Sequence, residues 1–477
     1  MVDLIVRGGT VVTPSPSQPS VLDVAVEAGR IVAVTSPGLL DGAGTKEIDA
    51  TGKIVLPGGI EPHAHIQTRV NIEWAGEPNV YTQSVEAASR AAVFGGVTTI
   101  VDFAPPQRAT EGGPSIVSDV EVRRGDFAGH SYTDFTFHYI LVGDVPDPIL
   151  HGIGEAVEAG IASFKVFTTF GATRVPYGRL ADVSAEVARH GGILAVHAEE
   201  DEIVTRTRAR LIAEGHDEGF NLPLVHSNLS EDVAFRTVIR IARHHGAAVY
   251  FVHTTAKEGV DAIAEARAAG LPIYGEALHH YLHFTAEDYR KPEGTAIHTY
   301  PAIKSAEDRE ALTAGLLDGR LSTTATDEYT TSKAIKLSGD TLETVCGGHN
   351  GIETRVPVAF TKLVQERGMS LSRFADVIAT NAARILGMYP QKGAIAPGSD
   401  ADLVILDPNL NRTIRLADLH ADSDYSIWDG FECRGYPVTT ILRGKVVADG
   451  GALLGSPGDG EWLARRVDPS VLAAPVV

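Results

Sequence analysis

The sequence has little of several features that would place it in a particular class. Among 477 residues there are only two cysteines, Cys346 and Cys433, too few for a disulfide framework, so a reducing compartment is expected. No apolar run approaches the ~20 residues of a membrane-spanning helix. Residues 1–12 alternate like a strand and contain no signal-peptide core, so we expect a cytoplasmic protein with no membrane partner.

Basic residues are also in deficit. Lys and Arg number 41 against 61 Asp and Glu, which gives a formal net charge of −20. Such a charge repels phosphate backbones and anionic surfaces, so no nucleic-acid partner is expected. The hydrophobic fraction of 44% and the charged fraction of 21% are those of a globular protein. Internal repeats and low-complexity tracts are missing as well, which argues against a solenoid.

The hydrophobic pattern changes period along the chain. Residues 4–49 read as short strands separated by turns that contain Gly and Pro. From residue 53 to about 327, apolar runs of strand length alternate with helical stretches. The predicted strands begin near Lys53, Val97, Asp134, Ala162, Gly192, Ala247, Leu271 and Leu321. Eight such units in about 275 residues are typical of a (β/α)8 barrel.

Helices over 356–366 and 371–386 are predicted to cover the barrel, and short strands return at 401–407, 412–415 and 438–447. Neither end of the chain has enough apolar residues to stand alone, so both ends are expected to build one small β-sandwich. The prediction is an α/β protein with a TIM barrel over 53–390. Its sandwich domain combines residues 1–52 with residues 391–477, which include the tail.

Six potential metal ligands lie at or near the C-terminal ends of the predicted strands. They are His63, His65, Lys165, His197, His253 and Asp327. His63 and His65 are two residues apart, so in an extended segment both imidazoles point to the same face. Catalytic groups of a (β/α)8 barrel gather at that end of the barrel. The pattern therefore predicts a site for two divalent ions in a hydrolase.

Lys165 stands in the middle of an apolar strand, residues 162–167. A buried lysine often forms an ion pair, and single histidines at strand ends often bind no metal. Beside four histidines, however, a desolvated neutral amine can take up carbon dioxide and become a carbamate, an anionic bridge between two ions. The joint pattern of six residues supports this interpretation better than any one of them does.

Five segments together resemble the dihydropyrimidinase and hydantoinase branch of the amidohydrolase superfamily. They are PGGIEPHAH (57–65), SFKVF (163–167), HAE (197–199), NAARILG (381–387) and GAIAPGSDADL (393–403). The match extends from residue 4 to about residue 447. The resemblance implies a distorted barrel with a composite β-sandwich. It also implies hydrolysis of the amide bond of a cyclic ureide or imide, of the hydantoin or dihydropyrimidine type.

The resemblance further implies roles for the six ligands. One Zn²⁺ would be held by His63, His65 and Asp327, the other by His197 and His253, with carboxylated Lys165 as the bridge. Asp327 would also take a proton from the attacking hydroxide and return it to the leaving nitrogen. Members of this family are usually homotetramers, and residues 425–434 are expected to help pack the subunits.

Four positions depart from the residues usual in this family. Phe170 stands where a tyrosine stabilises the oxyanion, and losing one such donor costs about 10²–10³ in rate unless another group replaces it. Tyr300 replaces a substrate-contacting serine and is, with a metal ion, a candidate for that donor. Gly347 replaces an asparagine that makes its contact through the backbone, and Glu328 replaces a histidine. Phe170, Tyr300 and Gly347 are therefore predicted substrate contacts.

Single residues distinguish this chain from several enzymes with related activities. Dihydroorotase usually has an arginine two residues after the histidine pair, where this chain has Gln67, which cannot form a charged clamp. Deaminases with one metal lack the bridging lysine that is present here as Lys165. Allantoinase shares the same ligands and stays open, as does a non-catalytic dihydropyrimidinase-related scaffold.

Loops after the first, second and fourth barrel strands are expected to shape the pocket for the ring substituent. They span residues 66–80, 104–114 and 168–177. Trp74, Phe170 and Tyr177 indicate a roomy aromatic site, although Trp74 could instead cover a subunit interface. The identity and stereochemistry of the substrate ring do not follow from these residues.

Overall fold

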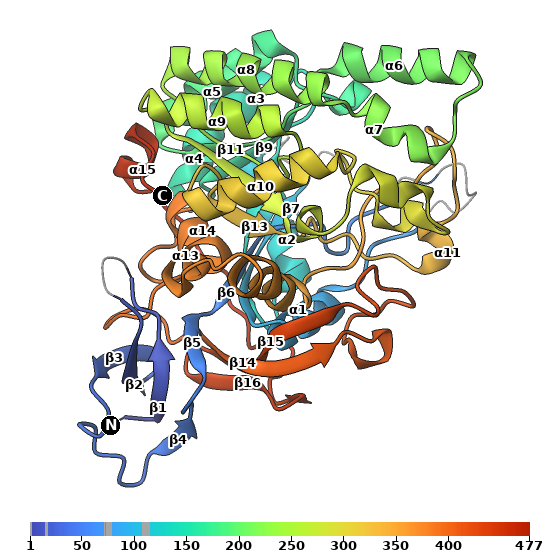
Figure 1. Cartoon of the computed structure of the whole chain (residues 1–477). Coiled ribbons are helices and arrows are strands. Elements are labelled where there is room, and N and C mark those ends of the chain that lie inside the picture. The colour runs from blue at the N-terminus through green and yellow to red at the C-terminus, as the bar shows by residue number, and fades with distance from the viewer. Residues whose placement is uncertain (1, 15–17, 71, 73–78, 107–114) are drawn as a thin grey trace.

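The computed structural model describes residues 2–14, 18–70, 72, 79–106 and 115–477. Two sheets organise the chain, one of eight strands and one of nine. In Figure 1 the eight-stranded sheet lies among the helices, and the other sheet lies below it. Trp74 and parts of the predicted loops 66–80 and 104–114 lie outside the described residues.

The eight-stranded sheet is the predicted barrel. Its strands are β6 (Gly59–Ala64), β7 (Val97–Ala104), β8 (Asp134–Ile140), β9 (Ser163–Phe167), β10 (Ile193–His197), β11 (Ala248–Phe251), β12 (Ile273–Leu278) and β13 (Thr323–Ala325). Neighbouring strands pair in parallel, in sequence order. The first and last strands approach each other where the His65 N–H donates to the Glu328 carbonyl at 2.8 Å. The prediction of a (β/α)8 barrel is confirmed.

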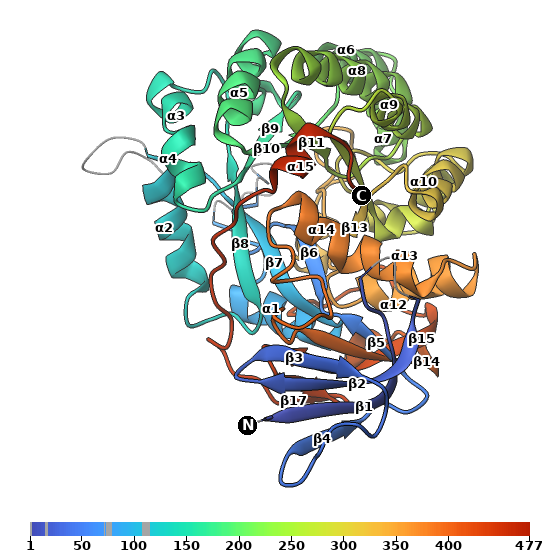
Figure 2. The same ribbon diagram turned by 90° about the vertical axis from the view of Figure 1, so that its left-hand side faces the viewer.

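Helices surround these strands (Figure 2). The longer ones are α1 (Val85–Phe94), α2 (Ile116–Phe127), α5 (Tyr177–His190), α6 (Asp201–Ala213), α8 (Asn228–His245), α9 (Lys257–Ala268) and α10 (Ala306–Asp318). Shorter ones are α3 (Asp147–His151), α4 (Ile153–Glu158), α7 (Leu222–Val225), α11 (Lys333–Lys336) and α15 (Pro469–Ala473). Helix α8 shows how the sequence sets helix ends. Ser227 caps it by accepting from the Ser230 N–H, and Gly246 ends it at a φ of 69°, which favours glycine.

The two helices predicted at 356–366 and 371–386 are present but interrupted. The first is α12 (Arg355–Ala359), which continues into a π-helical turn over Phe360–Gln365. The second is α13 (Leu371–Ala375) and α14 (Asn381–Ile385), with a π-helical turn at Asp376–Thr380 between them. Apolar periodicity predicts the helices, but it does not reveal a local change of hydrogen-bond pattern.

The nine-stranded sheet combines N-terminal and C-terminal strands, as predicted, whereas the tail after Leu453 contacts the barrel, where the Tyr274 hydroxyl donates to the Val471 carbonyl. Its strands are β1 (Leu4–Val11), β2 (Ser20–Glu27), β3 (Arg30–Thr35), β4 (Lys46–Asp49), β5 (Ile54–Pro57), β14 (Leu403–Thr413), β15 (Glu432–Leu442), β16 (Lys445–Asp449) and β17 (Ala452–Leu453). Strand β5 joins the two ends because it pairs in parallel with β1 and antiparallel with β14. Val6, Val55, Leu403 and Ile441 are buried together in the core of this domain.

The strand predicted to begin near Lys53 is wrong as a single barrel strand. Strand β5 belongs to the terminal sheet, and the barrel begins with β6 at Gly59. Gly58 separates the two strands, and a Cβ there would lie 2.2 Å from Oγ1 of Thr98. Only glycine allows such a close approach, which is why the chain can pass from one sheet to the other here. The domain boundaries after residues 52 and 390 stay predictions.

The predicted strands of the C-terminal part also differ in detail. The runs at 401–407 and 412–415 lie largely within one strand, β14, whereas the run at 438–447 is divided between β15 and β16 by a turn at Arg443 and Gly444. A change of register within β14 explains why its sequence reads as two strands.

A buried ionic cluster fastens the barrel to the terminal domain. Lys392 Nζ lies 2.5 Å from Asp134 Oδ2, 3.0 Å from Asp400 Oδ2 and 2.6 Å from Asp402 Oδ2, and its side chain is 1% exposed. Asp134 begins β8 of the barrel and also pairs with Arg443 of the terminal domain. Removing one charge from such a cluster would leave buried charges unpaired, which is strongly unfavourable. The cluster therefore stabilises the observed arrangement of the two domains.

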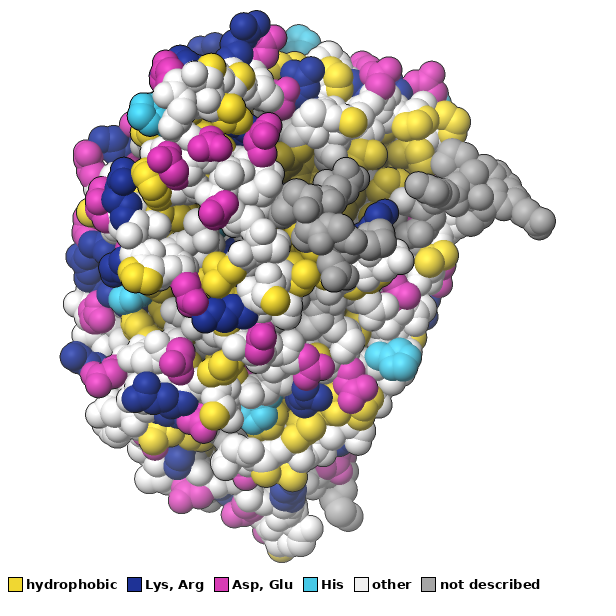
Figure 3. Space-filling view, turned by 90° about the vertical axis from the view of Figure 1, so that its right-hand side faces the viewer, with side chains coloured by type: hydrophobic (Ala, Val, Ile, Leu, Met, Phe, Trp, Pro, Cys, Tyr) yellow, Lys and Arg dark blue, Asp and Glu magenta, His cyan; other side chains and the backbone are white. Residues whose placement is uncertain are grey.

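On the face drawn in Figure 3, acidic and basic side chains are interspersed rather than grouped by sign. Within the described ranges, no helix combines the length and the low polarity that crossing a membrane requires.

Candidate active site

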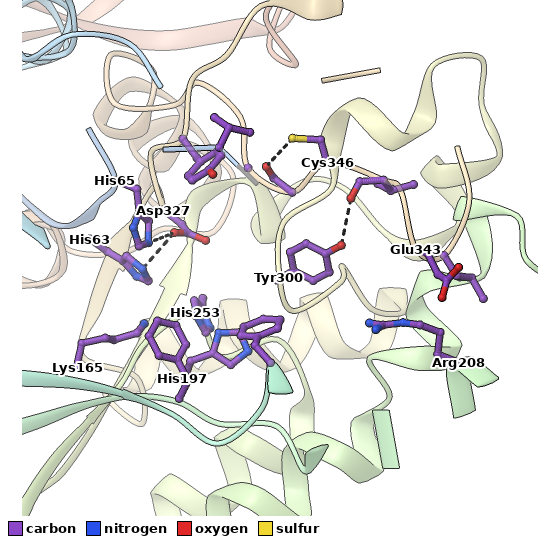
Figure 4. A pocket seen from close by; sticks show the side chains of 18 residues that line it. His63, His65, Lys165, His197, Arg208, His253, Tyr300, Asp327, Glu343 and Cys346 are labelled. Atoms are coloured by element: carbon purple, nitrogen blue, oxygen red, sulfur yellow. Dashed lines mark hydrogen bonds and ion pairs between the residues drawn. The ribbon is translucent and has the colours of Figure 1, made fainter. Parts of the chain in front are cut away.

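All six predicted ligands line one pocket of about 380 Å³. His63, Lys165 and His197 belong to or directly follow β6, β9 and β10. His65, His253 and Asp327 lie one or two residues beyond β6, β11 and β13. Figure 4 shows their side chains converging from these strands into the pocket. Parallel barrel strands end at the same edge, so residues far apart in sequence meet there.

The tightest group consists of His63, His65 and Asp327. One ligand atom from each lies within 4.8 Å of the others. Asp327 Oδ1 is 3.1 Å from His63 Nε2 and 3.2 Å from His65 Nε2. His253 adjoins this group, with its ring centroid 5.3 Å from that of His63 and 4.4 Å from that of His197. The arrangement offers one three-residue ligand set and two further imidazoles beside it.

Lys165 is buried without a counter-ion. Its side chain is part of a residue only 1% exposed, and none of the described residues forms an ion pair with its Nζ. Instead, Nζ lies 5.1 Å from the ring centroid of Phe103 and 4.9 Å from that of Phe167. Burial lowers the pKa of Lys165 to about 8, although Asp327 and Glu276 act in the opposite direction. The amine is therefore more often neutral than an ordinary lysine amine.

The charges of the cluster favour a cation between its members. Burial acts to raise the pKa of Asp327, but the charge and contacts of His63 and His65 outweigh it and hold that pKa well below its usual range. Burial, together with the charges of His197 and Lys165, holds the pKa of His253 well below its usual range. At neutral pH Asp327 is thus a carboxylate and His253 a neutral imidazole, the forms that bind metals. Burial acts to lower the pKa of His63, but the charges of Asp327 and Glu276 outweigh it and raise that pKa to about 9, so an ion that binds His63 would displace a proton.

Three residues around the cluster have left-handed backbone angles. Asp327 has a φ of 53°, His253 a φ of 39° and Phe170 a φ of 73°. Residues other than glycine rarely adopt these angles, and when they do they often lie at functional sites, where the surrounding structure holds them. Each follows a barrel strand, so the turns that leave these strands aim the side chains into the pocket.

Sequence reasoning missed Glu276, a buried carboxylate behind two of the ligands. Its Oε1 accepts hydrogen bonds from His63 Nδ1 at 2.9 Å and from the His253 N–H at 3.0 Å. Tyr250 donates to the other oxygen at 2.6 Å. The first bond leaves Nε2 of His63 for a metal. A single acid within the apolar strand β12 is the signal that could have identified it.

Glu199 orients His197 in the same way, whereas Glu61 supports the backbone of His63. Glu199 accepts from His197 Nε2 and from His226 Nδ1, both at 2.8 Å, which leaves Nδ1 of His197 for a metal. Glu61 pairs with Arg355 at 3.1 Å and accepts from the His63 N–H at 3.1 Å. Glu199 belongs to the HAE segment, and Glu61 precedes the histidine pair, so both were adjacent to predicted ligands.

The predicted substrate contacts Phe170, Tyr300 and Gly347 all line the pocket. The Phe170 ring centroid lies 4.7 Å from that of His197 and 5.7 Å from that of Tyr300. The Tyr300 hydroxyl donates to the Val345 carbonyl at 3.1 Å, and burial raises the pKa of Tyr300 to about 12. Because that proton is engaged away from the cluster, the geometry does not favour Tyr300 as the oxyanion donor.

Two other predicted positions point away from the pocket. Glu328 accepts from the backbone N–H groups of Gly351 and Ile352 at 2.7 and 2.8 Å, so it supports a loop instead of binding a metal. Tyr177 is not among the described residues that line the pocket. Its ring packs at the start of α5, where burial raises the pKa of Tyr177 to about 12. The far end of the pocket is lined instead by Arg208, Leu342, Glu343, Val345 and Cys346.

Comparison with known proteins supports the same reading. The profile of the amidohydrolase family matches residues 54–447. The chain is 32% identical to the D-hydantoinase of Ralstonia pickettii, over 97% of this chain and 99% of that protein. It is 31% identical to the D-phenylhydantoinase of Escherichia coli (strain SE11), over 97% and 98% respectively. The solved dihydropyrimidinase of Brevibacillus agri NCHU1002 superimposes with a TM-score of 0.90 at 29% identity, over 98% of this chain and 99% of that one.

Proposed function

This chain belongs to the amidohydrolase family, in the branch of the hydantoinases and dihydropyrimidinases, and we propose that it uses two zinc ions to open the amide bond of a cyclic ureide or imide. The ring is of the hydantoin or dihydropyrimidine type. The observation that supports this most is the buried Lys165 amine, which has no counter-ion among the described residues and lies beside four histidines and Asp327. An amine in that position suits a carbamate bridge better than an ion pair.

The residues present fit a pair of divalent ions. Imidazole nitrogens and carboxylate oxygens are the donors that zinc takes in hydrolytic sites. His63, His65 and Asp327 would hold one ion, since their ligand atoms already lie within 4.8 Å of one another. His197 and His253 would hold the second, with the Lys165 carbamate shared between the two. Glu276 and Glu199 fix the imidazole orientations that such a site needs.

The carbamate would form from the neutral amine. The Lys165 Nζ lone pair adds to the carbon of carbon dioxide, and one proton leaves, which gives a carboxylate on Nζ. The pKa of about 8 makes the neutral amine available near neutral pH. The new negative charge would be stabilised by the cations beside it, in a position where the protonated lysine has no ion-pair partner among the described residues.

Bound zinc would supply Lewis-acid activation of a water molecule and of the ring carbonyl. Asp327 is ionised at neutral pH because its pKa is held low, so it can accept the proton of the attacking water. It then delivers that proton to the ring nitrogen as the amide bond breaks. The apolar faces of Phe167 and Phe170 limit the access of bulk water to this end of the pocket.

Metal analysis and a ring-opening assay test the proposal together. We expect two zinc ions per chain, and loss of activity on chelation that is restored by added zinc. Dihydrouracil, hydantoin, a cyclic imide and allantoin should be followed by ring-opening absorbance. If zinc-loaded protein opens none of these rings, the enzymatic proposal fails, and a protein that binds no metal would support the scaffold. Preferred hydrolysis of allantoin would support allantoinase.

The carbamate has its own test. Denaturation in acid should release one carbon dioxide per chain from zinc-loaded protein, and labelled carbon dioxide should be incorporated during reloading. Lys165→Met should abolish this label and weaken binding of the second ion. An unmodified amine in protein that holds two zinc ions would contradict the bridge while leaving the metal pair intact.

The proposal also includes a cytoplasmic location and assembly into a homotetramer. Both cysteines are buried and unpaired, which suits a reducing compartment such as the cytoplasm. For a homotetramer, the segment 425–434 can contribute only part of its residues, because Tyr425 and Trp428 are buried in the chain itself. Glu432 and Arg434 are exposed. Light scattering of wild type and of a variant with both of these residues changed to alanine would test the contact.

A further inference from the structure

Arg208 lies at the far end of the pocket from the ligand cluster. It projects from α6, and Figure 4 shows it across the pocket from His63, His65 and Asp327, with Tyr300 between them. A ring held at the ligand cluster would therefore direct its substituent toward this arginine. The position of Arg208 makes it a candidate for recognising the substituent.

The guanidinium of Arg208 is not neutralised by the residues that the structure describes. On the same helix, Arg206 and Arg210 pair with Glu202 and Glu214 at 3.6 and 3.1 Å. Arg208 forms no such pair and no hydrogen bond with a described residue, and its Nε is shut off from solvent without a partner. A buried N–H without an acceptor is unfavourable, and a ligand oxygen would relieve it.

The surroundings of Arg208 indicate which kind of ligand group would accept a hydrogen bond from it. Leu342, Val345 and the Tyr300 ring give this part of the pocket apolar walls, along which an aliphatic arm can lie. The charge of Arg208 reaches Tyr300, whose pKa it lowers against the larger effect of burial. Glu343 lies at the exposed rim and forms no ion pair with Arg208 within the described chain. A planar carboxylate matches the donor geometry of a guanidinium.

We propose that Arg208 is a specificity residue that binds a carboxylate at the end of a short aliphatic substituent on the substrate ring. The inference rests on the proposed function, because the ring must be placed at the ligand cluster for its arm to reach this end. It narrows the substrate class from cyclic ureides and imides in general to those with an acidic side arm. From a hydantoin with such an arm, the product would be the N-carbamoyl derivative of an acidic amino acid, and from a cyclic imide it would be an acid monoamide.

A matched pair of substrates tests this assignment. Zinc-loaded wild type is assayed on hydantoin with a 2-carboxyethyl arm and on its neutral counterpart with a 2-carbamoylethyl arm. We expect a kcat/KM about 10- to 100-fold higher for the acid, the size of a charge-assisted hydrogen bond. Arg208→Met should remove this preference by lowering kcat/KM for the acid far more than for the neutral substrate. Arg206→Met is the control, because its side chain is 82% exposed and paired with Glu202.

A substitution of Glu343, at the rim of the pocket, should change the substrate preference in the opposite direction. Glu343→Gln removes a like charge near the carboxylate, so it should raise the preference for the acid several-fold, and high salt should reduce that gain. Equal kcat/KM for the two substrates in wild type, or an equal loss for both in Arg208→Met, would overturn the proposal.

Binding separates a failure of this inference from a failure of the proposed function. In an Asp327→Asn background, calorimetric titration measures affinity for the two hydantoins without turnover, after metal analysis has established its zinc content, because Asp327 is also a proposed zinc ligand. Tighter binding of the acid that disappears in Arg208→Met would support the carboxylate site even if no ring is opened by the wild type. Ring opening without any preference between the two compounds would support the proposed function and reject the role of Arg208.

Discussion

The ring of Tyr300 occupies the space next to Gly347. A Cβ built on Gly347 would lie 2.5 Å from Cδ2 of Tyr300 and 2.7 Å from Cε2, closer than such atoms can approach. Both residues depart from those usual in the family that the sequence resembles, where a serine and an asparagine are expected. The two departures therefore compensate each other, since the large ring of Tyr300 fits only because residue 347 has no side chain.

This relationship predicts a non-additive pair of substitutions. Gly347→Ala should lower the free energy of unfolding by about 1–3 kcal/mol, because the new methyl group forces the ring to move. In a Tyr300→Ser background the same change should cost much less, which a double-mutant cycle by denaturant unfolding measures. Gly178→Ala, on open helix surface, is the control. Equal costs in both backgrounds would show that the ring is not the obstacle.

The Tyr300 hydroxyl is predicted to matter little for turnover. It donates to the Val345 carbonyl at 3.1 Å, so Tyr300→Phe should lower stability by about 1 kcal/mol and leave kcat within a few-fold of wild type. Unfolding and steady-state kinetics on the same preparation check both numbers. A fall in kcat of about 10² or more, the cost of losing an oxyanion donor, would instead assign that role to the tyrosine.

Glu276 is predicted to be a positioning residue for the metal ligands. Glu276→Gln keeps the size of the side chain but weakens its hold on His63 Nδ1 and the His253 N–H, which lie 2.9 and 3.0 Å away. Zinc affinity should fall about 10- to 100-fold, measured by competition with a chelator. Activity at saturating zinc should recover in large part. Unchanged affinity would mean that the ligands keep their orientation without the carboxylate.

The ionic cluster between the domains is predicted to be sensitive to the loss of Lys392. Lys392→Met leaves Asp134, Asp400 and Asp402 without their shared cation in a buried place, so stability should fall by about 3–5 kcal/mol. Lys445→Met removes an exposed pair with Asp459 and should cost about 1 kcal/mol or less. Denaturant unfolding of the two variants compares them, and similar costs would argue against a special role for burial.

Because Lys336 is buried, we predict that the stability of the protein rises with pH in the alkaline range. Its Nζ donates to the carbonyls of His298 and Cys346 at 2.8 and 2.7 Å, and burial lowers the pKa of Lys336 to about 8 from 10.5. Between these two values the unfolded chain binds more protons than the folded one. The burial penalty on the charge therefore applies in full below pH 8 and is gone above the unfolded pKa, so stability rises with pH across this window.

The contribution of Lys336 is isolated by comparing wild type with Lys336→Met. Relative to that variant, wild type should gain up to about 1.4 kcal/mol per pH unit in this window, measured by denaturant unfolding. Lys333→Met, which removes an exposed lysine paired with Glu293, should follow the wild-type profile. If the free energies of unfolding of wild type and Lys336→Met differed by the same amount at every pH, the lowered pKa of Lys336 would be contradicted.

The barrel and the six residues that meet in its pocket could be predicted from sequence because both depend on local patterns. Buried parallel strands appear as short apolar runs, and the residue that follows each run lies at the catalytic edge whatever the rest of the chain does. His63, His65, His197 and His253 are of this kind, whereas Lys165 lies within its strand. Glu276 shows the same pattern within β12 and was missed because one acid in an apolar strand has several explanations.

Other features depended on partners distant in the chain. Strand β5 resembles the start of a barrel strand, yet it pairs with β1 and β14, and this choice rests on a strand that begins at Leu403. The direction of the Tyr300 hydroxyl likewise follows from segments that only the fold brings together, and so does the lack of a partner for Arg208 among the described residues. Sequence by itself determined which groups can do the chemistry, because ligand type and strand period are local properties. Tertiary structure alone decided which of the remaining side chains face the pocket and with what charge, because those contacts are long-range.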